Sequence, residues 1–317
     1  MNFSVLSDQF WSLALQGVAL GLVYSLVSLG YTMVYGVLRL INFANSEVFM
    51  LGTMATLVTE ERIFHITTES EKVHGAKLIL ILGASLVASM VVCAVLAILV
   101  ELVAYRRLRA RGANRLASLI SAIGVSIFLM ELVRIITQSK PLSAPRVLQK
   151  WSFGSIAGAD FRIDTVVSII VPIVVFVILD RFVTKTRLGK SIRAVSMSEE
   201  NSKLMGININ RVITLTFCIG GITTGIASFI YTTVYENTVY KVGFTMGIAA
   251  FTAAVLGGIG NLRGAFYGGL ALGILEQFSS ALLGSQWKSV TVFVVLVVIL
   301  LFKPNGLFGE AVQQTRT

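Results

Sequence analysis

Polar side chains interrupt one apolar stretch near the N-terminus, and they are the best candidates for chemistry in this sequence. The stretch is GYTMVYGVLRLINFANSEVFMLG, residues 30–52, and its polar residues are Asn42, Asn45, Ser46 and Glu47. Amides and a carboxylate are costly to place in lipid, so they are expected to face protein or a water-filled path. Glu47 is therefore the leading candidate for a functional charge inside a membrane. The alternative is an interfacial carboxylate at a helix start that Asn42 or Asn45 caps.

Residue sets for catalysis or metal binding are missing from the sequence. It contains no GxxxxGK[ST] phosphate-binding loop and no HExxH or GxSxG motif. The two histidines, His65 and His74, share one polar loop without a third ligand at a recognisable spacing. Cys93 and Cys218 lie within apolar runs, which is typical of small buried side chains. We expect this chain not to be an enzyme and to bind no metal or cofactor of its own.

Composition identifies the class of protein that must position these residues. Apolar residues make up 55% of the 317 and charged residues only 13%, whereas soluble domains carry about 25% charged residues. The net charge of +10 arises from Lys and Arg between apolar runs, as in the cytoplasmic loops of membrane proteins. Nucleic-acid binding is therefore not expected. We predict an all-α integral membrane protein, a polytopic helical bundle with one domain over residues 1–317.

Nine apolar stretches predict the spanning helices, with about 8–10 as the range of the count. They are 11–38, 41–58, 78–100, 117–136, 164–183, 212–232, 243–259, 264–283 and 290–303. The second, seventh and ninth are short, so some segments are expected to be discontinuous. With the N-terminus outside, the inside loops hold the dense basic clusters at 106–115 and 180–211. This bias predicts an external N-terminus and a cytoplasmic C-terminus.

The segment TKTRLGKSIRAVSMSEENSKLMGININRV, residues 184–212, is the only sizeable cytoplasmic connection that this topology predicts. Its key residues are Ser196, Glu199, Glu200, Leu204, Met205 and Gly206. The serine and first glutamate have capping-box spacing, and both glutamates suit a first helical turn. The leucine and methionine form a small apolar face, and the glycine suits a left-handed helix end. We predict a short helix of about two turns, with a plain amphipathic connector as the alternative.

A glycine-rich stretch follows in AFTAAVLGGIGNLRGAFYGGLALGILEQFSSALL, residues 250–283. Its glycines include Gly257, Gly258, Gly260, Gly264 and Gly268. Small residues four apart allow helices to approach closely in a bilayer. The run GGIGNLRG is expected to form a tight cytoplasmic turn with Arg263 facing water. Elsewhere, Glu131 and Arg134 have a spacing that permits an ion pair, and Glu276 is expected to form a hydrogen bond within the bundle.

These three segments, in this order, resemble the LivH type of branched-chain amino acid permease of ABC importers. The first contains INFANSE, where the family typically has INFAHGE, so that Asn45 and Ser46 depart from the pattern. The second has the family's Arg-Ala and MGIN..RV spacing, and the third its AFTAAVLGGIG signature. Together with the terminal KPNGLFG, the resemblance covers approximately residues 10–309.

The resemblance implies an importer of the bacterial inner membrane built from several subunits. These would be two related or identical permeases, two cytoplasmic ATPases that bind ATP and Mg, and a periplasmic or lipid-anchored substrate-binding protein. Residues 184–211 would form the coupling loop, with 197–206 docking on the ATPase. The implied cargo is a branched-chain or other neutral amino acid, with urea or short amides as the alternative.

An ion-coupled secondary transporter is a rival from another class. Such a transporter calls for ionisable residues deep in several spans. Only Glu47, Glu131 and Glu276 approach that description.

Overall fold

The computed structural model describes residues 9–66, 75–145, 147, 152–156 and 159–309, and it is almost wholly helical. Helices lie at all nine apolar stretches: α2 (Phe10–Leu38), α3 (Ala44–Val58), α4 (Ala76–Val100), α6 (Arg115–Ile136), α7 (Ile163–Lys185), α10 (Ile209–Tyr235), α11 (Val242–Gly257), α12 (Leu262–Leu283) and α13 (Lys288–Phe302). The predicted all-α class is confirmed, and the ends of these helices agree with the predicted spans to within a few residues.

Shorter elements connect the long helices. They are the π-helical turns η1 (Thr59–Ile63) and η2 (Glu101–Arg106), the helices α5 (Arg107–Ala110), α8 (Arg187–Met197) and α9 (Glu199–Leu204), and the 3-10 turn η3 (Ser285–Trp287). Two small antiparallel pairs also occur, β1 (Leu142–Ser143) with β4 (Asn237–Thr238) and β2 (Ser152–Ile156) with β3 (Ala159–Arg162).

Seven helical segments within the described residues are long and apolar enough to cross a membrane. They are α2, α4 with its continuation to Ala110, α6, α7, α10, α12, and α13 together with η3. The helices α3 and α11 have only 15 and 16 residues, and at about 1.5 Å per residue they fall short of a hydrocarbon core of about 30 Å. Both are among the stretches that the sequence marks as short.

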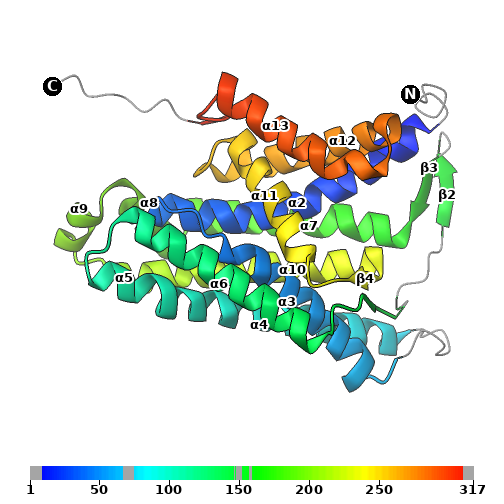
Figure 1. Ribbon diagram of the computed structural model, residues 1–317, viewed down its shortest axis with the longest axis horizontal. Coiled ribbons are helices and arrows are strands. Elements are labelled where there is room, and N and C mark those ends of the chain that lie inside the picture. The colour runs from blue at the N-terminus through cyan, green and yellow to red at the C-terminus, as the bar shows by residue number, and fades with distance from the viewer. Residues whose placement is uncertain (1–8, 67–74, 146, 148–151, 157–158, 310–317) are drawn as a thin grey trace.

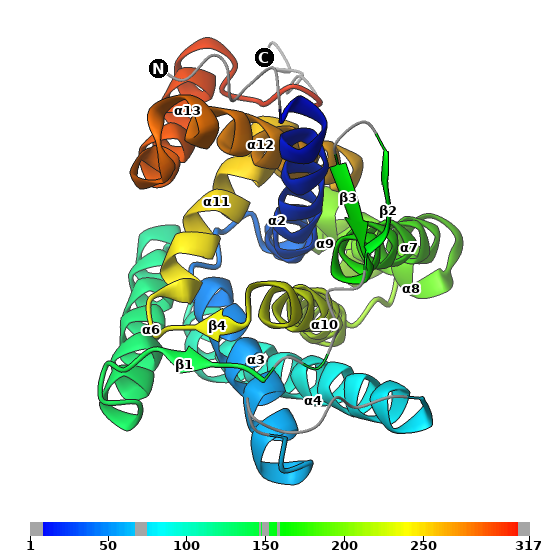
Figure 2. The same cartoon turned by 90° about the vertical axis from the view of Figure 1, so that its right-hand side faces the viewer.

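Helix α2 forms the centre of the bundle, with α7, α10, α11 and α12 around it (Figure 2). In the most apolar stretch of each helix, 78% of the residues of α2 and 72% of those of α10 are buried. In α4, α6, α7 and α13 the buried share is 28% or less. Apolar side chains such as Ile120, Phe128 and Ile178 are exposed on these outer helices. Exposed surfaces of this kind are compatible with lipid, so the outer helices form the lipid-facing side of the fold.

Close helix packing at the centre depends on glycines. On α12, Gly269 and Gly273 lie against the backbone of α2, at Ser25 and Gly21. Gly264 and Gly268 of α12 face the other way, against Gly257 and neighbouring backbone of α11. The predicted close approach is confirmed for Gly264 and Gly268, and Gly269 and Gly273 make contacts of the same kind, because an added Cβ would overlap backbone atoms that cannot rotate away.

The connecting segments gather at two opposite ends of the bundle (Figure 1). One, called here the α9 end, carries α5, α8 and α9. The other, called the β2 end, carries β2, β3 and β4. The pairing of β1 with β4 joins the segments after α6 and α10, through Leu142 opposite Thr238. Alternating spans require such a separation of loops.

Candidate functional site

The polar residues of INFANSE lie inside the bundle where α3 begins. All four are buried, at no more than 5% exposure: Asn42, Asn45, Ser46 and Glu47. The Asn45 amide lies 3.2 Å from the Thr224 hydroxyl of α10. The Tyr105 hydroxyl of η2 donates to Asn42 Oδ1 at 3.2 Å. Polar contacts therefore tie the start of α3 to α10 and η2 within an otherwise apolar interior.

Glu47 lies in the first turn of α3 and is fully buried. Its Oε1 accepts hydrogen bonds of 3.3 Å from the hydroxyls of Ser46 and Ser126. Its Oε2 has no hydrogen-bond partner among the described residues, and a Cβ at Gly243 would lie 2.7 Å from that oxygen. Gly243 is in the first turn of α11, so two short helices begin beside one carboxylate and direct their positive ends toward it.

The alternative placed Glu47 at a helix start behind a capping asparagine, and the helix start is observed but the asparagine cap is wrong. Helix α3 follows Phe43, and no side chain caps its N-terminus. The two asparagines instead bond to other helices, and Glu47 has no exposed surface.

The connection at the α9 end contains two helices, and the serine that caps the second differs from the prediction. Ser198 is the N-cap of α9, and its hydroxyl accepts from the Asn201 N–H at 3.3 Å. Ser196 lies in the last turn of α8, where its hydroxyl donates to the Arg193 carbonyl at 2.7 Å. The predicted capping box is wrong because α8 continues through Met197. Glu199 and Glu200 do occupy the first turn of α9.

Gly206 ends α9 as predicted. Its φ is +80°, which lies in the left-handed region that favours glycine. The Gly206 N–H donates to the Lys203 carbonyl and the Ile207 N–H to the Ser202 carbonyl, both at 3.0 Å. This pair of bonds is the Schellman motif, which satisfies the last helical carbonyls and turns the chain toward α10.

Large apolar side chains project from the tip of these two helices. Met197, Leu204 and Met205 are 88%, 85% and 82% exposed. Arg39, directly after α2, donates to the Ser196 carbonyl at 3.1 Å and so ties the end of α8 to the end of α2. The tip is an exposed apolar surface on an element that is fastened to the central helix.

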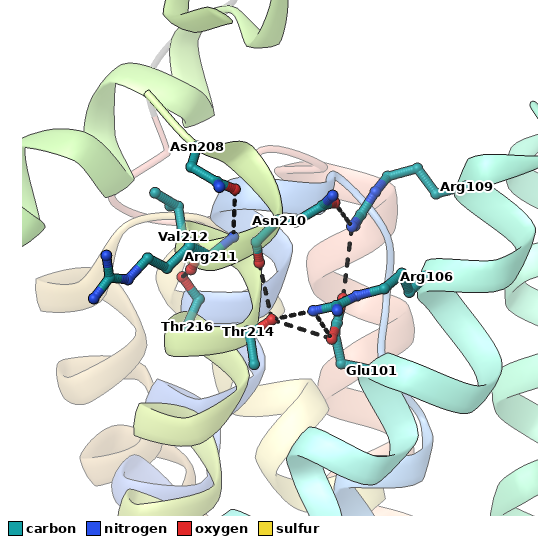
Figure 3. Close-up of polar contacts among 9 residues, drawn as sticks. All are labelled: Glu101, Arg106, Arg109, Asn208, Asn210, Arg211, Val212, Thr214 and Thr216. Atoms are coloured by element: carbon teal, nitrogen blue, oxygen red, sulfur yellow. Dashed lines mark hydrogen bonds and ion pairs between the residues drawn. The ribbon is translucent and has the colours of Figure 1, made fainter. Parts of the chain in front are cut away.

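A buried ion-pair network that the sequence analysis missed lies beside this tip (Figure 3). Glu101, fully buried in η2, accepts from Arg106 Nε and Nη2 at 3.1 and 2.9 Å. Arg109 lies 3.5 Å from Glu101 Oε1 and donates to Asn210 of α10 at 2.7 Å. Thr214 of α10 completes the network, at 3.2 Å from Glu101 Oε2. The sequence signal was a single carboxylate between an apolar span and an arginine cluster.

The glycine-rich turn between α11 and α12 is held by the terminal KPNGLFG segment. Gly258 and Gly260 both have φ of +100°, so the turn requires glycine. The Leu307 and Phe308 N–H groups donate to the Leu256 and Gly257 carbonyls at 2.8 and 3.2 Å. These contacts satisfy the carbonyls at the end of α11, which have no partner within the helix.

The other sequence-predicted groups have simple placements. Arg134 pairs with Glu131 at 2.6 Å on the surface of α6, and Arg263, with a 66% exposed side chain, pairs with Asp180 at 3.0 Å. Tyr24 donates to the buried Glu276 at 2.8 Å, which confirms a hydrogen bond within the bundle. His74 lies outside the described residues.

Comparisons with known proteins match the chain to one family of sequences. A family model described as "Branched-chain amino acid transport system / permease component" matches residues 13–301. The chain is 38% identical to the high-affinity branched-chain amino acid transport system permease protein BraD of Pseudomonas aeruginosa, over 93% of this chain and 94% of that protein.

Two further relatives show a higher and a lower sequence identity to this chain. The chain is 36% identical to the permease protein LivH of the same kind of system in Escherichia coli, over 96% of this chain and 98% of that protein. Identity falls to 23% with the ribose import permease protein RbsC of Haemophilus influenzae, over 59% of this chain and 60% of that one. No solved structure matches the chain significantly.

Proposed function

Because the chain belongs to the permease component family of branched-chain amino acid transport systems, we propose that it forms half of the translocation path of an ATP-driven importer. The cargo is a branched-chain or other neutral amino acid. Relatives that carry branched-chain amino acid names align over more than nine-tenths of the chain. The partners are a second permease of the same family, two cytoplasmic ATPases with their ATP and Mg, and a substrate-binding protein.

The exposed apolar tip of α8 and α9 is the observation that carries this proposal. Met197, Leu204 and Met205 are more than four-fifths exposed, and exposed apolar surface of this kind marks an interaction site. In the proposed complex the tip enters a cleft on the ATPase. Glu199 and Glu200 border it and provide charge for a basic partner surface.

Movement of the ATPase reaches the membrane through rigid contacts rather than chemistry. Arg39 links the end of α8 to α2, and the Gly206 turn leads directly into α10. The Glu101 network then joins the start of α10 to η2. A displacement of the tip is therefore expected to shift α2, α10 and the end of α4 together.

The junction of α3 and α11 is proposed as part of the translocation path in a closed state. Both helices are too short to span the membrane alone, and they begin beside Glu47. Short, discontinuous helices commonly surround transport sites in membrane proteins. Asn42 and Asn45 fix the position of this junction against η2 and α10, and Ser46 bonds within it to the Phe43 carbonyl.

In the proposed orientation, the N-terminus lies outside the bacterial inner membrane and the α9 end lies in the cytoplasm. Arg106, Arg107, Arg109 and Arg111 gather at the α9 end with the basic residues of α8. Basic residues concentrate in the cytoplasmic loops of membrane proteins.

Uptake of radiolabelled leucine in cells with and without this gene tests the proposed cargo. Uptake should require the gene and ATP, and unlabelled valine should compete while urea does not. Loss of urea or amide uptake, with leucine uptake intact, would reassign the cargo within the same family. Leucine uptake that follows an ion gradient and persists without ATP would indicate a secondary transporter instead.

A further inference from the structure

A cavity of about 360 Å³ lies toward the β2 end, between α2, α10, α11, α12 and α13. Its volume falls in the range of about 300–1,000 Å³ that is typical of small-molecule sites. The lining combines two opposite charges, three tyrosines and aliphatic side chains. Phe244 and Thr245 of this lining directly follow Gly243 at the start of α11, whereas Glu47 itself and the tip of α8 and α9 lie outside the lining.

The two charges are Glu276 of α12 and Lys288 of α13. Glu276 is 5% exposed, and the Tyr24 hydroxyl donates to its Oε2 at 2.8 Å. Lys288 is near enough to act electrostatically on Glu276, yet the ion pairs of the described residues do not include one between them. A carboxylate and an ammonium that face one cavity without pairing leave both charges for a ligand.

The remaining walls suit the rest of a neutral amino acid. Tyr231 and Tyr235 stand with ring centroids 4.6 Å apart on one side, and aromatic faces attract ammonium groups. Leu20, Met246 and Val292 supply aliphatic surface. A branched side chain is thus matched by apolar contacts, and the charged end by polar ones.

A second cavity, of about 370 Å³, adjoins the first and shares Tyr235 and Lys288 with it. Its lining is more polar, with Gln16 and Gln277 hydrogen-bonded to each other at 2.9 Å and an Arg162–Asp164 ion pair. In the proposed orientation this cavity lies on the external side, where a binding protein releases cargo.

We propose that the cavity between Glu276 and Lys288 is a low-affinity site for a zwitterionic α-amino acid on its way into the translocation path. Glu276 binds the ammonium group, Lys288 binds the carboxylate, and the aliphatic wall receives the side chain. The identity of the ligand rests on the proposed function, whereas the placement of the site rests on the cavity.

Equilibrium binding of radiolabelled leucine to the purified permease–ATPase complex, without binding protein, tests this site. Glu276→Gln keeps an acceptor for Tyr24, and Lys288→Gln keeps most of the side-chain length. Each variant should weaken leucine binding about tenfold or more, because a charge-assisted hydrogen bond is lost. Glu131→Gln and Lys140→Gln are the matched controls outside the cavity and should bind as the unaltered complex does.

Two leucine analogues separate a binding role from a structural one. Glu276→Gln should weaken competition by leucine amide, which keeps the ammonium group, and spare 4-methylpentanoate, which lacks it. Lys288→Gln should do the reverse. The site would be overturned if either variant weakened competition by both analogues equally, or if both variants bound leucine as the unaltered complex does. It would also be overturned if the unaltered complex bound no leucine up to tens of millimolar.

A parallel uptake assay distinguishes the two levels of failure. If the unaltered importer transports leucine and the variants bind it normally, only the site assignment is overturned. If the unaltered importer does not transport leucine, the proposed cargo and the ligand of this cavity are overturned together.

Discussion

Gly206 is the residue at which the chain must turn from the proposed coupling helix α9 into the span α10. An L-residue at its φ of +80° costs about 1–2 kcal/mol, enough to change a local equilibrium about 5–30-fold. We therefore expect Gly206→Ala, and more strongly Gly206→Val, to lower leucine uptake per hydrolysed ATP several-fold in reconstituted importer. Gly124→Ala is the matched control, since Gly124 lies within α6 with open space around it. Unchanged coupling in both Gly206 variants, with the ATPase still bound, would rule out the coupling role.

Glu101 is expected to stabilise the fold at the junction of η2 and α10. Glu101→Gln removes a fully buried charge and leaves Arg106 and Arg109 close together without their shared partner. Because both arginines are partly exposed, the loss of stability should be about 1–3 kcal/mol, less than for a fully buried pair. The melting temperature of the purified complex should therefore fall. It can be measured from the reaction of a thiol dye with Cys93, which is buried in the folded protein.

The control for this variant is Glu131→Gln on α6. Glu131 and Arg134 are 41% and 46% exposed, and such a surface pair contributes about 0–1 kcal/mol. Equal melting temperatures for the two glutamine variants would contradict a stabilising role of the Glu101 network.

The missed capping serine illustrates the limit of single-residue inference. Both Ser196 and Ser198 precede acidic residues, and spacing alone favoured the former. The choice depends on where α8 stops, and α8 gains its length from burial of Ile192 and Val195 against the bundle. Tertiary packing of this kind is not visible in a local capping pattern.

Among the helices, α2 and α12 approach each other closely enough that a single added methyl group tests their packing. A Cβ at Gly21 would lie 2.7 Å from the Leu270 carbonyl oxygen, and neither backbone can move without shifting a helix. Gly21→Ala should destabilise the bundle by about 1–3 kcal/mol, as overpacking does. Gly36→Ala, on the same helix with open space around it, should be neutral or slightly stabilising. Yield and melting temperature of the purified permease measure both effects, and equal behaviour would refute the close contact.

The long helices were predictable because hydropathy reports directly on the requirement to span a membrane. The sequence showed that α3 and α11 are short. It could not show that both begin beside Glu47, since residues 47 and 243 are far apart in sequence. The strands at the β2 end and the π-helical turn that carries Glu101 gave no comparable signal. Short irregular elements depend on contacts with neighbouring helices, and those contacts have no fixed period in the sequence.

In the molecule as a whole, the connecting loops lie at two opposite ends of the bundle, as expected for a transporter that spans a membrane. Outer helices expose apolar surface to lipid, and the central helices pack through small residues. Buried carboxylates of the described residues include Glu47 at the α3–α11 junction, Glu101 in its network and Glu276 beside its cavity, and also Glu60 in η1 and Asp164 in α7. Buried charges at membrane depth mark functional positions more often than structural ones.

The orientation of the whole chain can be tested with two matched substitutions. Lys140 is exposed after α6 at the β2 end, and Lys190 is exposed on α8 at the α9 end. In a background with Cys218 replaced by alanine, and with Cys93 buried, we expect Lys140→Cys to react with a membrane-impermeant maleimide in spheroplasts. Lys190→Cys should react only after the membrane is permeabilised, because the α9 end would lie in the cytoplasm. The reverse pattern would invert the topology and place the tip of α8 and α9 out of reach of a cytoplasmic ATPase, which would also remove the observation that carries the proposed function.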